Sequence, residues 1–280
     1  MSFPRTVVAG ISLPRMLIGS NWIFGWSHRG NAADIFIKNQ HSTTESTLAV
    51  LNAFLQYGVD AWMGPFSSHP EANDRIKAIQ DKIGKKLILI DTPIINVDDN
   101  PAARKEAESI IKNSADIGST FCLIHHSSCE QLVNKNKKTI DRLPDYTKMI
   151  RDAGLIPGLS AHMPEIIQYS DLNSYDVETY IQIFNCMGFL MQVEVESVIK
   201  IIHEAKKPVM TIKPMAAGRT TPYVGITFNF NVIRQQDMVT VGCINEHEVH
   251  EDVEIGLAAL ERRLPDLTAR GSPAKQSIIR

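Results

Sequence analysis

The sequence predicts an α/β protein, a TIM-type (β/α)8 barrel preceded by a β-hairpin. Eight short apolar runs alternate with longer segments that carry helix signals along the 280 residues. The runs are almost continuously apolar, as expected for parallel strands covered on both faces. Eight strand–helix units in a chain of this length favour a barrel over a doubly wound sheet, and no G-x-G-x-x-G follows an early run. The expected strands are 15–21, 59–65, 86–93, 120–126, 155–162, 179–185, 207–215 and 238–245.

The segments between these runs begin and end with residues typical of helices. The stretches 42–45 and 68–71 both have the pattern of a capping box, in which a hydroxyl and a later carboxylate satisfy free backbone amides. Asn100 followed by Pro101 places a capping side chain before a proline that the first helical turn tolerates. The acidic start and basic end of 194–207 suit the helix dipole. Ahead of the first strand, the two β-prone pieces within 1–14 predict a hairpin that closes the barrel's amino-terminal end.

Composition and charge bound the classes of function. The chain is 44% hydrophobic and 21% charged with a net charge of −2, which offers no electrostatic attraction for nucleic acid or an acidic membrane. We expect no signal peptide and no transmembrane span. The four cysteines lack metal-binding spacing, so we expect free thiols and a cytoplasmic protein. We expect one domain over 1–280, with a tail at 265–280, and a small-molecule partner. A homo-oligomer is left open.

Polar residues collect where the expected strands end, which is where barrel enzymes carry their active sites. For any single member, a solvated rim residue is the alternative to a functional one. His125 and His126 are adjacent and would point to opposite faces of a strand, so at most one should face the barrel mouth. The expected ring of strand-end residues is Asn21, Met63, Asp91, His125 or His126, His162, Asn185, Lys213 and Asn245.

Within this ring, one histidine is expected to move a proton, either His125 or His162, with Asp91 orienting it. The same three side chains could hold a divalent metal, but no H-x-H or H-E-x-x-H is present, so a metal site is the weaker alternative. No nucleophile elbow supports a serine hydrolase. Asn21 and Asn185 are expected to contact the substrate.

Lys213 ends the seventh apolar run and leads into a loop with small residues, Gly218 and Arg219. A desolvated lysine there could form a Schiff base, bind an anion as a point charge, or make a structural ion pair. Barrel phosphate sites favour the loops after strands seven and eight, and a glycine lets the backbone approach an anion that Arg219 can bind in a bidentate manner. The pattern favours an anion or substrate clamp.

Several segments, taken in order, resemble the aldo-keto reductases, which are NADP-dependent barrels with an N-terminal hairpin. The resemblance covers most of the chain and implies that His125 occupies the place of the catalytic histidine. It also implies that the loop after Lys213 lies along the cofactor pyrophosphate. The segments that carry it are "YGVDAWMGPF", "IHH", "GLIPGLSAH", "YIQIFN", "IKPMAAG" and "TVGCINEHEVHEDVE", behind the hairpin that leads into "MLIGSNWIFG".

The sequence departs from that family at its catalytic tetrad. The position of the family's aspartate falls on Met63, no tyrosine follows within 63–72, and the third strand ends Asp91–Thr92–Pro93 without a lysine. Only His125 is retained, so hydride transfer to a carbonyl loses its usual proton donor. We therefore expect a lyase, aldolase or isomerase acting on a small polar or anionic carbonyl or carbohydrate-type metabolite. The alternatives are an atypical NADP-dependent oxidoreductase, a metal-dependent hydrolase and a non-catalytic binding barrel.

Overall fold

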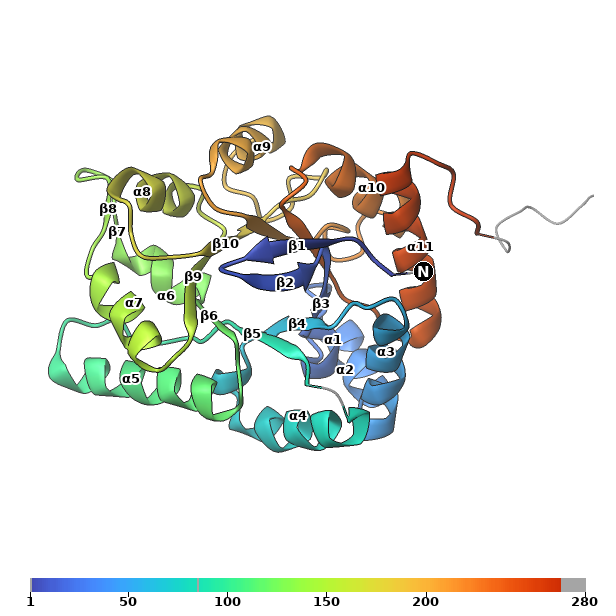
Figure 1. The fold of residues 1–280 in the computed structure, drawn as a ribbon, viewed down its shortest axis with the longest axis horizontal. Coiled ribbons are helices and arrows are strands. Elements are labelled where there is room, and N and C mark those ends of the chain that lie inside the picture. The colour runs from blue at the N-terminus through green and yellow to red at the C-terminus, as the bar shows by residue number, and fades with distance from the viewer. Residues whose placement is uncertain (1, 85, 268–280) are drawn as a thin grey trace, which may run out of the picture.

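Residues 2–84 and 86–267 are described by a computed structural model, in which eight parallel strands close into a barrel (Figure 1). This confirms the predicted fold class, and each observed strand lies within one of the eight apolar runs. In order around the barrel they are β3 (Met16–Gly19), β4 (Ala61–Gly64), β5 (Ile88–Asp91), β6 (Phe121–Ile124), β9 (Ile156–Ala161), β10 (Thr179–Ile183), β11 (Val209–Ile212) and β12 (Met238–Val241), which pairs back onto β3.

Helices surround the barrel and connect its strands. The Asn100 side chain caps one of them as predicted, accepting the Ala103 amide at 2.9 Å. The two capping boxes are displaced: Thr43, not Ser42, caps its helix, and His69 precedes the other without a side-chain cap. The outer helices are α3 (Thr44–Gln56), α4 (Pro70–Ile83), α5 (Pro101–Asp116), α7 (Leu143–Asp152), α8 (Glu165–Asn173), α9 (Val195–Glu204), α10 (Pro222–Val232) and α11 (Glu246–Glu261).

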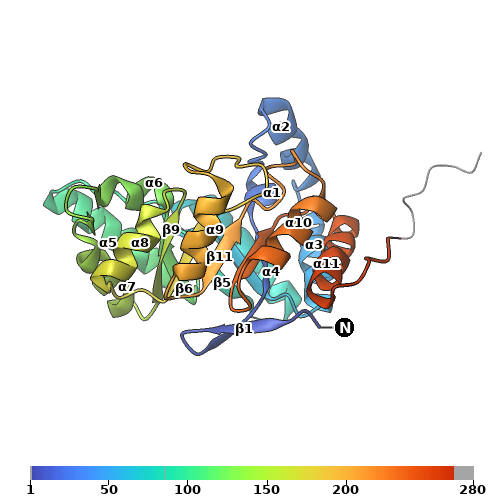
Figure 2. The ribbon, with the colours of Figure 1, turned by 90° about the horizontal axis from the view of Figure 1, so that it is seen from above.

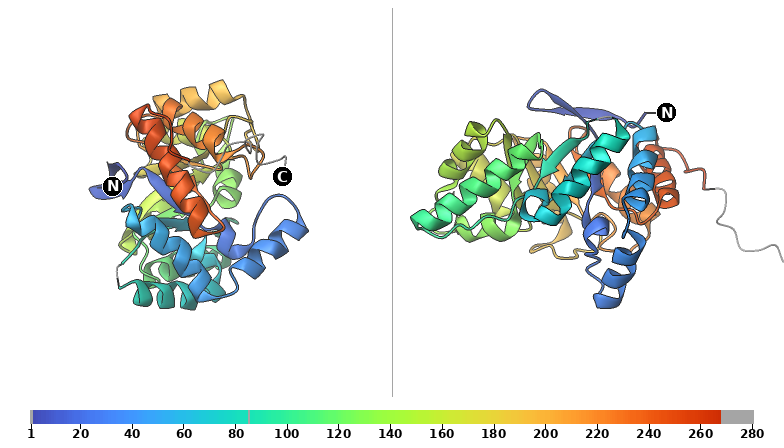
Figure 3. Two further views of the ribbon diagram at one scale, coloured as in Figure 1. Left: turned by 90° about the vertical axis from the view of Figure 1, so that its right-hand side faces the viewer. Right: turned by 90° about the horizontal axis from the view of Figure 1, so that it is seen from below.

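The predicted hairpin, β1 (Arg5–Val8) paired with β2 (Ile11–Pro14), lies across one end of the barrel. Val8 and Leu13 are buried and pack with the side chains that fill the barrel interior. Figure 2 shows this hairpin at the end opposite α2 (Asn31–Gln40), and the right-hand view of Figure 3 agrees. The hairpin therefore closes the amino-terminal end and leaves the other end as the mouth.

Side chains alternate along each barrel strand between the interior and the helix layer, as the twofold period of a strand requires. The interior cluster is separate from the larger core between strands and helices. Apart from Val8 and Leu13, its fully buried members are Leu17, Ala61, Met63, Ile90, Phe121, Leu123, Ile181, Met210 and Met238. This alternation decides which strand-end residues can face the mouth.

Two excursions from the barrel pattern lie among the mouth loops. Between β3 and α3 the chain forms α1 (Asn21–Phe24) and α2, and α2 projects beyond the barrel (Figures 2 and 3). Between β6 and α7 the chain forms α6 (His126–Cys129), a 3₁₀ turn, and the small hairpin of β7 (Val133–Asn134) and β8 (Thr139–Ile140).

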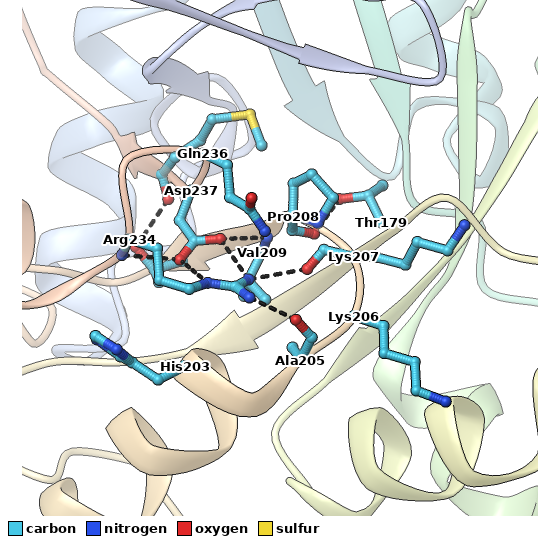
Figure 4. Close-up of polar contacts among 12 residues, drawn as sticks. Thr179, His203, Ala205, Lys206, Lys207, Pro208, Val209, Arg234, Gln236 and Asp237 are labelled. Carbon is cyan, nitrogen blue, oxygen red and sulfur yellow. Dashed lines mark hydrogen bonds and ion pairs between the residues drawn. The ribbon is translucent and has the colours of Figure 1, made fainter.

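The strand that leads to Lys213 is anchored at its opposite end by a buried ion pair (Figure 4). Asp237 is fully buried and accepts the Val209 amide at 2.9 Å and Arg234 Nη2 at 2.8 Å. Arg234 also donates to the carbonyls of Ala205 and Lys207, so one guanidinium fixes the turn before β11. Breaking such a pair leaves an uncompensated buried charge, which costs about 3–5 kcal/mol.

No helix among the described residues is long and apolar enough to cross a membrane. Of the expected tail at 265–280, only residues 265–267 fall within the described part of the chain.

Candidate active site

The barrel mouth holds a cavity of about 1200 Å³. Strand ends form its floor, and residues of the 21–40 excursion and of α11 line its sides. Small-molecule sites in proteins usually measure about 300–1,000 Å³, so this cavity has room for two small molecules. Of the expected site residues, the structure brings six to its wall: Asn21, His125, His162, Lys213, Gly218 and Arg219.

Lys213 reaches the cavity because the backbone turns at this residue. Interior-facing Ile212 ends β11, and strict alternation would send the next side chain into the helix layer. Lys213 instead has φ of 59°, in the left-handed region, and both side chains line the cavity. Ala216 and Ala217 also have positive φ values, at 50° and 56°. Each such residue costs on the order of 1–3 kcal/mol, and this strain persists only where the surroundings impose it.

Burial lowers the pKa of Lys213 to about 8. Its Nζ lies 2.9 Å from Nε2 of His28, which the 21–40 excursion carries to the mouth. Asn21 Nδ2 lies 3.2 Å from the same ring nitrogen. An ammonium group can only donate, so Nε2 of His28 accepts and the neutral ring carries its proton on Nδ1. Burial, and then the Lys213 charge, lower the pKa of His28.

Three further histidines form a stack on the cavity wall. The ring centroids of His125 and His126 are 4.2 Å apart, and those of His126 and His162 are 4.0 Å apart. Burial is the main cause that lowers the pKa of His125 to about 4 and that of His162 to about 3, with neighbouring positive groups adding to it. All three rings are therefore neutral at physiological pH.

Both histidines of the adjacent pair line the cavity, so the prediction that at most one of them faces the mouth is wrong. The strand ends at Ile124, and His126 already begins α6. His125 caps that helix: the Ser127 amide donates to its Nδ1 at 3.3 Å. Since Nδ1 accepts, the neutral ring of His125 carries its proton on Nε2.

Glu130 fixes the far side of this stack. Its Oε1 accepts the amides of His162 and Met163 at 2.6 and 2.8 Å, and its Oε2 lies 4.0 Å from Nδ1 of His126. One carboxylate thus ties the loop after β9 to the helix after β6. The rings are held in place before any ligand binds.

The Arg219 side chain mainly contacts the protein and holds the loop after β11 in place. Arg219 Nη1 donates to the Ala216 carbonyl at 3.1 Å, Nη2 donates to the His28 carbonyl at 3.4 Å, and its Cζ lies 3.8 Å from the Phe189 ring centroid. Arg219 was expected to bind an anion with both guanidinium NH2 groups, but each of them already donates to a backbone carbonyl. Gly218, with φ of 77°, lies against Arg29, whose Nη1 would be 3.4 Å from a Cβ placed there.

Two expected site residues lie away from the cavity. Asp91 is fully buried; its side chain faces the helix layer, where Oδ1 accepts the Ser67 amide at 3.2 Å, and burial raises its pKa. It cannot orient a histidine at the mouth. Asn185 is also fully buried, and it holds its own loop by accepting the Phe189 amide at 2.9 Å. With Asp91 facing the helices, the expected metal set is not assembled, and the described residues contain no group of three or more acidic, cysteine or histidine ligands placed to hold a metal ion.

Sequence reasoning missed His28 and Arg29, which come from the excursion rather than from a strand end. No periodic pattern marks them, and His28 meets a lysine 185 positions away. Ser160 also faces the cavity, because it alternates with Leu159 and Ala161 in β9.

No model of a protein family matches the chain, and no curated protein matches it in sequence. Solved structures do match. A putative aldo-keto reductase from Pseudomonas aeruginosa aligns with a TM-score of 0.65 at 13% identity, over 91% of this chain and 95% of that one. An aldo-keto reductase from Klebsiella pneumoniae in complex with NADPH aligns at 0.59 and 13%, over 95% and 92% of the two chains. The aldose reductase from Giardia lamblia aligns at 0.55 and 12%, over 91% and 89%.

These matches correct the functional class expected from sequence. The lyase, aldolase or isomerase interpretation rested on the missing tetrad, whereas the structures that share this barrel carry reductase names. The oxidoreductase alternative fits better. At 11–13% identity the likeness concerns architecture, and in architecture the chain resembles the aldo-keto reductases.

Proposed function

We propose that the protein is an atypical NADP-dependent oxidoreductase that reduces the carbonyl group of a small molecule, with Lys213 as the proton donor. The observation that carries the proposal is the half-buried ammonium of Lys213 at a cavity whose histidines are all neutral. A general acid works best when its pKa lies near the working pH, and burial brings the pKa of Lys213 to about 8.

The neutral histidines give this acid a suitable partner. His125 holds its Nδ1 against the Ser127 amide, which leaves the Nε2–H to donate to a carbonyl oxygen. A neutral N–H donor polarises the carbonyl without competing with Lys213 for the proton. His162 and His126 stack behind His125 and exclude water from one side of the site.

The cavity wall fits a nicotinamide dinucleotide. Its volume of about 1200 Å³ accommodates a cofactor beside a small substrate. Among the described residues, the Arg29 guanidinium has no hydrogen-bond or ion-pair partner, and it lies against Gly218, where the backbone is open to close approach. Arg29 and the 215–219 loop would hold the phosphates, and Ser160 would face the ring end.

The chain's own residues then divide the reaction as follows. NADPH, when bound, would supply the hydride for the new C–H bond at the carbonyl carbon and would be left as NADP⁺. His125 orients the carbonyl through Nε2–H, and Lys213 Nζ transfers a proton to the oxygen as the C=O π bond becomes an O–H bond. The products are an alcohol and a neutral Lys213 amine. In this scheme Lys213, which follows the seventh barrel strand, donates the proton that a tyrosine donates in the family that the sequence resembles.

The proposal is tested first by binding and then by turnover. NADPH is titrated into the protein, and we expect the NADPH fluorescence to change on binding. The change should saturate below millimolar cofactor. NADH is titrated in parallel, since Arg29 binds the phosphates of either. Absence of binding of both at millimolar concentration rejects the oxidoreductase.

Turnover is followed as loss of NADPH absorbance with a panel of aldehydes and ketones. The test variant is Arg29→Gln, which we expect to weaken cofactor binding about tenfold or more. Its melting temperature should stay unchanged, because the Arg29 guanidinium has no protein partner among the described residues. Equal affinity of the two proteins would remove Arg29 from the cofactor site.

Cellular location and domain organisation belong to the same proposal. Cys122, Cys129, Cys186 and Cys243 are all free thiols, which suits a reducing compartment. We place the enzyme in the cytoplasm as one barrel domain.

A further inference from the structure

The contact between Lys213 and His28 joins a half-buried lysine to a histidine exposed at the surface. We propose that His28 returns a proton from solvent to Lys213 after each turnover, an inference that rests on the proposed function. His28 is a positioning and proton-supply residue here and does not touch the substrate.

Lys213 is half-buried, and a substrate bound in the cavity would cover its exposed side, so another residue has to supply its proton. Of the titratable side chains around it, His28 is the one whose ring nitrogen lies within hydrogen-bond distance of Nζ, at 2.9 Å. The three stacked histidines lie within electrostatic reach of Lys213, but their rings contact one another, Ser127 and Glu130. His28 therefore connects the amine to the outside.

The position of His28 is fixed from three directions. Asn21 Nδ2 lies 3.2 Å from Nε2, and the His28 carbonyl accepts Arg219 Nη2 at 3.4 Å. The backbone at His28 has φ of 55°, a conformation a histidine adopts at a cost, and this aims the ring at the strand-seven loop. The excursion is thereby tied to the residues that carry Lys213.

The charges around His28 set when it takes up a proton. Burial opposes its protonation, as do Lys213 and Arg219 from the strand-seven loop and His126 from α6 when that ring is itself charged, whereas Asp34 on α2 favours it. While Lys213 is an ammonium, the ring stays neutral. When Lys213 has given its proton away, that repulsion is lost and the ring becomes more basic.

The transfer balances in two steps. A hydronium ion protonates Nε2 of His28 and is left as water, giving an imidazolium whose Nε2–H points at the Lys213 amine. That N–H bond then breaks as a new N–H bond forms on Nζ, which restores the ammonium and leaves His28 neutral with its proton on Nδ1. No oxidant or reductant is involved.

The experiment compares His28→Gln with His28→Ala. Glutamine can still accept a hydrogen bond from Lys213 but cannot carry a proton. We expect both variants to bind NADPH with unchanged affinity, to lose about tenfold or more in kcat, and to show a larger solvent deuterium isotope effect on kcat. Added imidazole should restore much of the rate of His28→Ala, with a dependence on imidazolium concentration.

His203→Gln is the matched control. His203 is an exposed histidine of α9, far from the mouth, and its Nε2 lies 2.7 Å from the Val232 carbonyl oxygen. It should match the unchanged protein in every readout. If His28→Gln keeps the kcat and isotope effect of the unchanged protein, His28 supplies no proton and the inference is overturned while the reductase stands. If the unchanged protein binds no nicotinamide cofactor and reduces no carbonyl, the proposed function itself fails.

Discussion

The barrel strands β5 and β11 both lead to a charged side chain at the mouth end, and the two charges have opposite fates. Asp91 is the last residue of β5 and is fully buried in the helix layer, where burial raises its pKa. Lys213 follows β11 and lines the cavity, where burial lowers its pKa to about 8. Burial favours the neutral form of each group. Only the lysine is placed where a neutral–charged interconversion can act on a ligand.

The difference comes from the backbone. Asp91 alternates with interior-facing Ile90 and so points outward, as a regular strand requires. Lys213 breaks the alternation through its positive φ. A charged residue at a strand end is therefore a site candidate only once its parity, or the turn that changes its parity, is known.

The largest effect should come from removing the amine. Lys213→Met keeps the apolar stem and removes the proton donor, so we expect kcat for carbonyl reduction to fall about 100-fold or more. Lys213→Arg separates acid from charge, because arginine keeps the positive charge and does not deprotonate. Cofactor affinity and kcat are measured for both. Full activity in Lys213→Arg would show that position 213 acts as a clamp.

The pH profile of the unchanged protein sharpens the same contrast. Lys213 must be protonated to act as the acid, so kcat for reduction should be level from about pH 6 to 7.5 and fall toward tenfold per unit above its pKa of about 8. The pKa values of His125 and His162, about 4 and 3, add no limb in this range. Initial rates across pH 5–10 provide the measurement. A profile that stays level to pH 10 would exclude Lys213 as the donor.

A more moderate effect should follow from disturbing the strained loop from behind. A Cβ at Gly225 of α10 would lie 2.6 Å from the Pro214 carbonyl oxygen, so Gly225→Ala must displace the loop that carries Lys213. We expect a loss of about 1–3 kcal/mol in the free energy of unfolding, measured by denaturant titration. Activity should fall as well.

Asn231→Ala, on the exposed side of the same helix, is the control for Gly225→Ala. It should change the free energy of unfolding by less than about 0.5 kcal/mol. If Gly225→Ala behaves like this control, the loop is not held against α10.

The smallest effect is expected at the other strand end. Asp91→Asn removes a carboxylate that the fold disfavours in its charged form, so activity should stay unchanged. The raised pKa means that the folded state binds a proton more tightly than the unfolded state, and the unchanged protein therefore loses stability as pH rises above the ordinary aspartate pKa toward the raised one. The melting temperature of Asp91→Asn relative to the unchanged protein should increase from pH 3 to pH 7. A loss of activity in this variant would return Asp91 to the site.

The barrel itself could be predicted because its signals are local. Each strand is a compact apolar run, and Asn100 with Pro101 marks a helix start that the structure reproduces. The two displaced capping boxes show the limit of such motifs, since a one-residue shift in the start of a helix changes which hydroxyl can reach the amides.

The cavity was harder to predict because its geometry depends on where each strand stops. The strand β6 ends one residue before His125, so this histidine faces inward and His126 follows it around the start of α6. His28 gave no signal at all, because the excursion that carries it has no counterpart in the strand–helix rhythm. Its contact with Lys213 is a property of the folded chain.

The hairpin of β1 and β2 has a consequence for the order of events at the site. With Val8 and Leu13 packed into one end of the barrel, we expect ligands to enter and leave the cavity from the mouth end. When two ligands occupy such a cavity at different depths, the deeper one binds first and dissociates last. The steady-state kinetics should accordingly be sequential and ordered, and the product bound nearer the mouth should be released before the product bound deeper in the cavity.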